Sequence, residues 1–107
     1  MRITVTEADG MSVVRFEGDL HIASVADAKP ELVAVLASRG GIQFDLSALG
    51  ECDTAGIQLL LMACTSARAK GKRCITLSHT AAFRTALDRV GIPVECFELQ
   101  TVAFDNA

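Results

Sequence analysis

One change of hydrophobic period, midway along the chain, constrains the fold more than any other feature. Apolar residues at Ile42, Phe44 and Leu46 alternate with polar ones, which predicts a half-buried strand. After a polar connection, apolar residues return at helical spacing over Ile57–Cys64. The sequence therefore predicts a strand, a loop and a helix in this order.

The loop before this helix carries the residues of greatest chemical interest. Asp53-Thr54-Ala55-Gly56 opens the helix, which places a carboxylate and a hydroxyl side by side at its N-terminus. Unpaired N–H groups and the positive end of the helix dipole make this a favourable place for a phosphate. Asp and Thr are also preferred capping residues, and on the residues alone capping is the commoner role. The arrangement suggests a switch centred on Thr54.

Strand and helix patterns alternate along the rest of the chain. Alternating residues on both sides of Asp9-Gly10 predict an N-terminal hairpin. Pro30 is tolerated in the first turn of a helix, so the regular part of the next helix is expected to start near Asp27. The predicted elements are strands around 3–5 and 13–17, a helix ending at Gly40-Gly41, strands at 42–46 and 73–77, the helix after Thr54, a last helix opened by Ser78 or Thr80 and stopped by Gly91, and a strand or extended tail at 94–99.

These patterns predict the α/β class, with one small mixed sheet, an N-terminal hairpin and helices packed against the sheet. Alternating strands and helices imply right-handed crossovers and a mostly parallel inner sheet. With 107 residues, half of them apolar, the chain is long enough for a core of its own. It has no run near the ~20 apolar residues of a membrane span and no signal-peptide pattern. We therefore expect a cytoplasmic protein that does not insert into a membrane.

Charge and motif content narrow the functional classes. A formal net charge of −3 argues against nucleic-acid binding. The basic cluster at 68–73 is interpreted as stabilising the end of a helix. The four cysteines lack the spacing of zinc ligands and are interpreted as core residues. No nucleotide-binding or hydrolase motif is present, so we expect no enzyme activity, no cofactor and no metal.

The central segment resembles a known family. Asp45-Leu46-Ser47-Ala48-Leu49, then Asp53-Thr54-Ala55-Gly56, then a Leu-rich helix ending in basic residues and Gly71, is similar to the STAS domain (sulphate transporter and anti-sigma factor antagonist). The resemblance continues through a strand at 71–77 and a helix at 83–92, and covers roughly residues 2–99. It implies a single STAS-like domain over 1–107, with 100–107 as an irregular tail or short helix.

The resemblance also implies a function. Thr54 falls on the position that antagonist-type STAS proteins phosphorylate, so the chain is expected to be a bacterial anti-sigma factor antagonist-like protein in signal transduction and transcription regulation. Its expected partners are a serine/threonine kinase of the anti-sigma type and a cognate phosphatase. Phosphorylation would add about −1.5 to −2 charges beside Asp53 and repel the partner.

The second helix offers a docking surface for such a partner. Leu59 and Met62 fall on the side of this helix opposite Ile57 and Leu60. A helix packed on one sheet face would leave that opposite side exposed to water. The predicted partner-binding residues are Asp53, Thr54, Ala55, Gly56, Gln58, Leu59 and Met62.

Two alternatives remain open from the sequence. The Asp-Thr-Ala-Gly form also resembles the small STAS subunit of bacterial phospholipid-transport ABC complexes, which would dock permanently on a transporter ATPase. A third interpretation is an adaptor in a chemotaxis or two-component pathway. The identity of the partner, the sigma factor controlled and the oligomeric state are not predicted.

Overall fold

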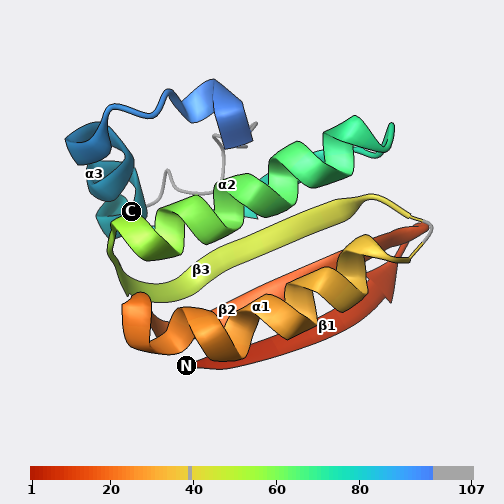
Figure 1. Ribbon diagram of the computed structural model, residues 1–107, viewed down its shortest axis with the longest axis horizontal. Coiled ribbons are helices and arrows are strands. Elements are labelled where there is room, and N and C mark those ends of the chain that lie inside the picture. The colour runs from red at the N-terminus through yellow and green to blue at the C-terminus, as the bar shows by residue number, and fades with distance from the viewer. Residues whose placement is uncertain (39, 98–107) are drawn as a thin grey trace.

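Strands and helices alternate after an N-terminal hairpin, as the sequence predicts (Figure 1). The computed structural model describes residues 1–38 and 40–97. The elements of this part are β1 (Arg2–Ala8), β2 (Met11–Leu20), α1 (Ile22–Leu36), β3 (Ile42–Cys52), α2 (Thr54–Ala69), β4 (Cys74–Ser78), α3 (Ala81–Val90) and the short 3-10 helix η1 (Val94–Phe97).

The described strands form one mixed sheet in the order β1-β2-β3-β4. The hairpin pair β1–β2 is antiparallel, whereas β2–β3 and β3–β4 are parallel. Asp9 and Gly10 form the hairpin turn with φ values of 52° and 79°, the left-handed backbone that tight hairpin turns require. The predicted α/β fold with an N-terminal hairpin is confirmed.

The core lies between the sheet and the helices that cover one of its faces. Alternate residues of β2 and β3 point into it, and Phe16 meets Phe44 edge to face with ring centroids 5.9 Å apart. Helices α1 and α2 lie side by side across this face, and α3 lies beside the start of α2 (Figure 1). The first residues of α1 and α2, the last residues of β3 and the helix α3 therefore gather at one end of the molecule.

Several boundaries differ from the prediction. Strand β3 continues to Cys52 through the expected polar connection, because the end of β2 pairs with it as far as Leu20. Helix α1 begins at Ile22 and contains Pro30, since tertiary packing of its apolar face outweighs the local cost of a proline. The expected strand or tail at 94–99 begins as the 3-10 helix η1, and its last two residues, with 100–107, lie outside the described residues.

The last helix follows the sequence closely. Thr80 caps α3 by accepting a hydrogen bond from the Phe83 N–H at 3.2 Å. Gly91 ends the helix with φ at 76°, a conformation that glycine adopts without strain. Among the described residues, no helix combines the length and the hydropathy needed to cross a membrane.

Candidate functional site

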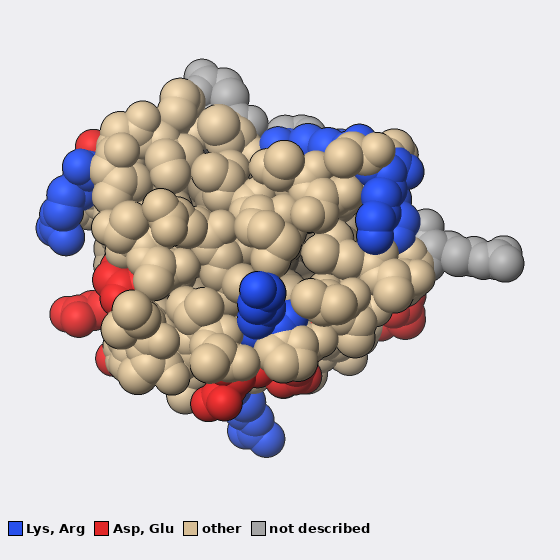
Figure 2. All heavy atoms as spheres, in the orientation of Figure 1, with Lys and Arg blue, Asp and Glu red and all other residues tan. Residues whose placement is uncertain are grey.

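Thr54 is the first residue of α2, and it is exposed. The prediction that it is accessible at the start of a helix is confirmed. No hydrogen bond engages its hydroxyl within the described part of the chain. The surface over the N-terminal half of α2 is mostly uncharged in the view of Figure 2. A free hydroxyl on such a surface is open both to a partner and to chemical modification.

The carboxylate of Asp53, the residue before Thr54, has a structural role. One oxygen of Asp53 accepts a hydrogen bond from the Gly56 N–H at 2.9 Å, and the other accepts one from the Ile22 N–H at 3.0 Å. Asp53 thus caps α2 and joins its start to the start of α1. The hydrogen bond from Gly56, helped by that from Ile22 and by the charge of His21, holds the pKa of Asp53 below its ordinary value.

Asp53→Ala is expected to lower the free energy of unfolding by about 1 kcal/mol at neutral pH, because both helix starts lose an acceptor. The folded-state pKa of Asp53 lies below its ordinary value of 3.8, so its stabilisation is present above that value and is lost as the pH falls through the folded-state pKa. The difference in free energy of unfolding between wild type and Asp53→Ala should therefore become smaller as the pH is lowered, as measured by urea denaturation. The control is Glu51→Ala, an exposed carboxylate on β3. An unchanged difference in acid would contradict the capping role.

The side of α2 that the sequence predicts to bind the partner is only partly exposed to solvent. Leu59 is 5% exposed and belongs to the core, and Met62 is half-buried against it. The expectation that both face water is wrong, because α2 is flanked by α1 on one side and by α3 and η1 on the other (Figure 1). A helix between two neighbours buries more than the side that faces the sheet.

Gly56 is also buried. A Cβ at this position would lie 2.6 Å from the Leu20 carbonyl oxygen and 2.9 Å from the Cys52 sulfur, so glycine lets α2 begin close to the end of β2.

The assignment of seven residues to a partner contact remains a prediction, and the exposed surface that these residues provide is smaller than expected. Of the predicted contact residues, Asp53, Thr54 and Gln58 are exposed, Ala55 and Met62 are half-buried, and Gly56 and Leu59 are buried.

Helix α3 contributes groups that the sequence analysis missed. A hollow of ≈ 130 Å³ is lined by Thr54, Asp53 and Arg89, and a neighbouring hollow of ≈ 390 Å³ extends from Arg89 to His21. Beside them Ile22 is 75% exposed, more than any other large apolar side chain whose burial the structure describes. The only sequence signal for this face is the helical spacing of Ala82, Thr85, Ala86 and Arg89, the residues of α3 that line the larger hollow.

The thiol of Cys52, two residues before Thr54, is held in its protonated form. Burial, and after it the negative charge of Asp53, raises the pKa of Cys52 to about 12, so the thiol stays protonated at neutral pH. Its position before a helix N-terminus does not produce a thiolate. In residues 1–38 and 40–97 no group of three or more His, Cys, Asp or Glu side chains is placed to hold a metal ion.

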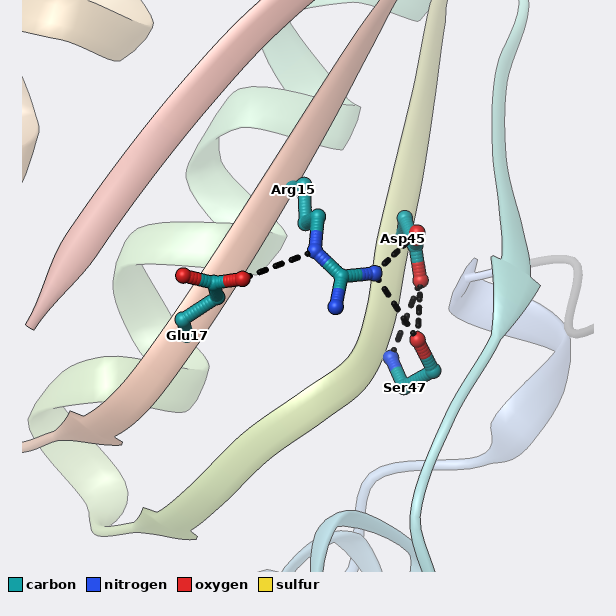
Figure 3. Close-up of polar contacts among 4 residues, drawn as sticks. All are labelled: Arg15, Glu17, Asp45 and Ser47. Atoms are coloured by element: carbon teal, nitrogen blue, oxygen red, sulfur yellow. Dashed lines mark hydrogen bonds and ion pairs between the residues drawn. The ribbon is translucent and has the colours of Figure 1, made fainter.

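A second polar cluster lies on the face of the sheet that α1 and α2 leave uncovered (Figure 3). Arg15 of β2 pairs with Asp45 of β3 at 2.9 Å and with Glu17 at 3.1 Å, and the Ser47 hydroxyl donates to Asp45 at 2.7 Å. Partial burial raises the pKa of Asp45, but hydrogen bonds from Ser47 and Arg15 outweigh it and hold the pKa below its ordinary value. These groups satisfy one another, so the cluster is a cross-strand contact.

Two of the four basic side chains in the cluster at the end of α2 are engaged within the molecule. Arg68 donates to the carbonyl oxygens of Cys96 at 2.6 Å and Cys74 at 3.0 Å. The Lys72 ammonium donates to the carbonyl oxygens of Leu36, at 2.7 Å, and of Ser38. These two cations join the ends of neighbouring segments, which supports a structural role for the cluster.

Solved structures share this fold. An anti-sigma factor antagonist from Mycobacterium paratuberculosis superposes with a TM-score of 0.82 at 23% identity, over 98% of this chain and 88% of that one. The Bacillus cell fate determinant SpoIIAA in its phosphorylated form has a TM-score of 0.70 at 18% identity, over 98% of both chains. An anti-sigma factor antagonist STAS domain from Rhodobacter sphaeroides has a TM-score of 0.55 at 22% identity, over 79% of this chain and 89% of that one. At these identities the likeness establishes the fold.

The sequence itself matches the family model described as "Mlab, STAS domain" over residues 3–95. No curated protein is similar enough in sequence to count as a match. The matched residues run from β1 through α3 and include the whole Asp53–Gly56 segment. This chain therefore belongs to the STAS domain family.

Proposed function

We propose that this chain is an anti-sigma factor antagonist-like regulator that binds a serine/threonine kinase of the anti-sigma type and is released when the kinase phosphorylates Thr54. The observation that carries the proposal is the exposed, unengaged hydroxyl of Thr54 at the first position of α2. Three proteins of the same fold are described as anti-sigma factor antagonists, and SpoIIAA has been solved in a phosphorylated form.

The surroundings of Thr54 suit a switch based on charge. Ile22, whose backbone N–H bonds to Asp53, and Gln58, one turn along α2, offer exposed uncharged side chains to a partner, and the exposed carboxylate of Asp53 lies directly before Thr54. A phosphate of about −1.5 to −2 charges on Thr54 would add charge to that contact and oppose binding. The phosphate would sit outside the core, so binding would be lost without refolding. A phosphatase would restore the neutral surface.

Phosphorylation by a purified kinase tests the proposal directly. Anti-sigma-type serine/threonine kinases from the source organism are incubated with the protein and ATP, and the products are mapped by mass spectrometry. We expect a single phosphate, on Thr54, and none in Thr54→Val, which keeps the shape of the side chain and removes the hydroxyl. Incorporation at another residue, or none with any of these kinases, would contradict the proposal.

A second candidate function is supported by two observations. The Asp53–Gly56 sequence also resembles the STAS subunit of bacterial phospholipid-transport ABC complexes, and the description of the matching family model names Mlab. In that case the Thr54 surface would hold a transporter ATPase permanently. A complex with an ATPase that survives purification and does not respond to phosphorylation would favour this second function over the first.

A further inference from the structure

Arg89 of α3 shares the small hollow beside Thr54. We infer that its guanidinium is the cationic partner of a phosphate on Thr54, so that α3 takes part in the phosphorylated state. This inference rests on the proposed phosphorylation of Thr54 and adds the residue that receives the phosphate. It assigns to α3 a role in regulation that its distance from Thr54 in the sequence conceals.

The fold places the two side chains on the wall of one hollow, from separate elements. Thr54 opens α2, Arg89 lies in the last turn of α3, and both line the hollow of ≈ 130 Å³ whose wall also includes Ile57, Ala86 and Val90. Ala86, one turn before Arg89, lines the hollow with a single methyl group. The hollow opens at the surface, so a group added to the Thr54 hydroxyl has space to enter it.

The guanidinium of Arg89 is available to bind a phosphate. Within the described residues it forms no ion pair and no hydrogen bond. Asp53 is the other charged residue of the small hollow, and both its carboxylate oxygens already accept backbone N–H groups. The larger hollow adds His21 and Glu51, and Glu51 does not line the wall beside Thr54. A doubly charged phosphate would therefore meet one uncommitted guanidinium, which can donate two parallel hydrogen bonds to phosphate oxygens.

A guanidinium so placed stabilises the dianion over the monoanion, which lowers the pKa of the second phosphate ionisation from its usual value of about 6. This effect can be measured without any kinase or partner. Full-length protein with phosphothreonine incorporated genetically at position 54 is titrated by ³¹P NMR. Wild type is compared with Arg89→Gln, Arg89→Lys and the control Arg84→Gln, an exposed arginine of the same helix that does not line the hollow.

We expect Arg89→Gln to raise the pKa of the phosphate by roughly half a pH unit or more, Arg89→Lys to raise it less, and Arg84→Gln to leave it near wild type. The titrations are repeated in a His21→Gln background, so that charging of the histidine does not contribute. Coincident curves for wild type and Arg89→Gln, with both proteins folded by circular dichroism, would overturn the inference. Because the phosphate is installed directly, that outcome would leave the kinase experiment unaffected, and failure of the kinase experiment would leave this titration interpretable.

Discussion

Leu60→Ala is expected to lower the free energy of unfolding by about 2–5 kcal/mol. Leu60 is 0% exposed on α2, packed in the core between the helices and the sheet. Removing three carbons from this position leaves a cavity that the surrounding side chains fill only partly. Urea denaturation followed by circular dichroism measures the loss directly from the midpoint and slope of the transition.

The matched control lies two residues earlier on the same helix. Gln58 is exposed, so Gln58→Ala should change the free energy of unfolding by no more than about 0.5 kcal/mol. Equal losses for the two variants would mean that the sides of α2 are not divided between core and solvent as described. A loss confined to Leu60→Ala would support the packing of α2 and, with it, the outward position of Thr54 on the same helix.

Phosphorylation of Thr54 should weaken binding to the kinase partner by roughly 100-fold, equivalent to about 2.8 kcal/mol. The reason is the negative charge that the phosphate adds next to Asp53 within the proposed contact. Titration calorimetry compares the phosphorylated and unphosphorylated proteins, with Thr54→Glu as a weaker mimic. Thr65→Glu is the control, because it adds the same charge to an exposed position of α2 about three turns away.

Equal affinities for the phosphorylated and unphosphorylated forms would contradict the switch and favour the permanently docked transporter subunit. Equal weakening by Thr54→Glu and Thr65→Glu would point to a general effect of net charge on association, and the specific role of the Thr54 surface would then be wrong. Weakening confined to position 54 is the result that the proposed function requires.

The docking surface shows where inference from the sequence fails. The helical phase of α2 separates Leu60 from Leu59 and Met62, and it places Leu60 in the core as observed. The same phase does not say what lies against the other sides. Because α1, α3 and η1 pack beside α2, Leu59 is buried and Met62 half-buried, while Ile22, from the start of α1, supplies exposed apolar surface instead.

Local patterns determined the parts of this protein that depend on neighbours in the chain. Hydrophobic period, cap residues and turn residues placed the hairpin, the inner strands, α2 and α3, and they put Thr54 at the exposed start of a helix. The extension of β3 to Cys52 and the start of α1 at Ile22 depended on partners distant in sequence, the end of β2 and the carboxylate of Asp53.

The hollow shared by Thr54 and Arg89 was decided by tertiary structure alone. Its walls come from the end of β3, from α2 and from α3, and the packing of both helices against the sheet sets how these helices meet. The helical period of apolar residues indicates which side chains share one side of a helix, because that period follows from backbone geometry. What faces that side is set by the packing of whole elements against one core, and this packing brings Arg89 to Thr54.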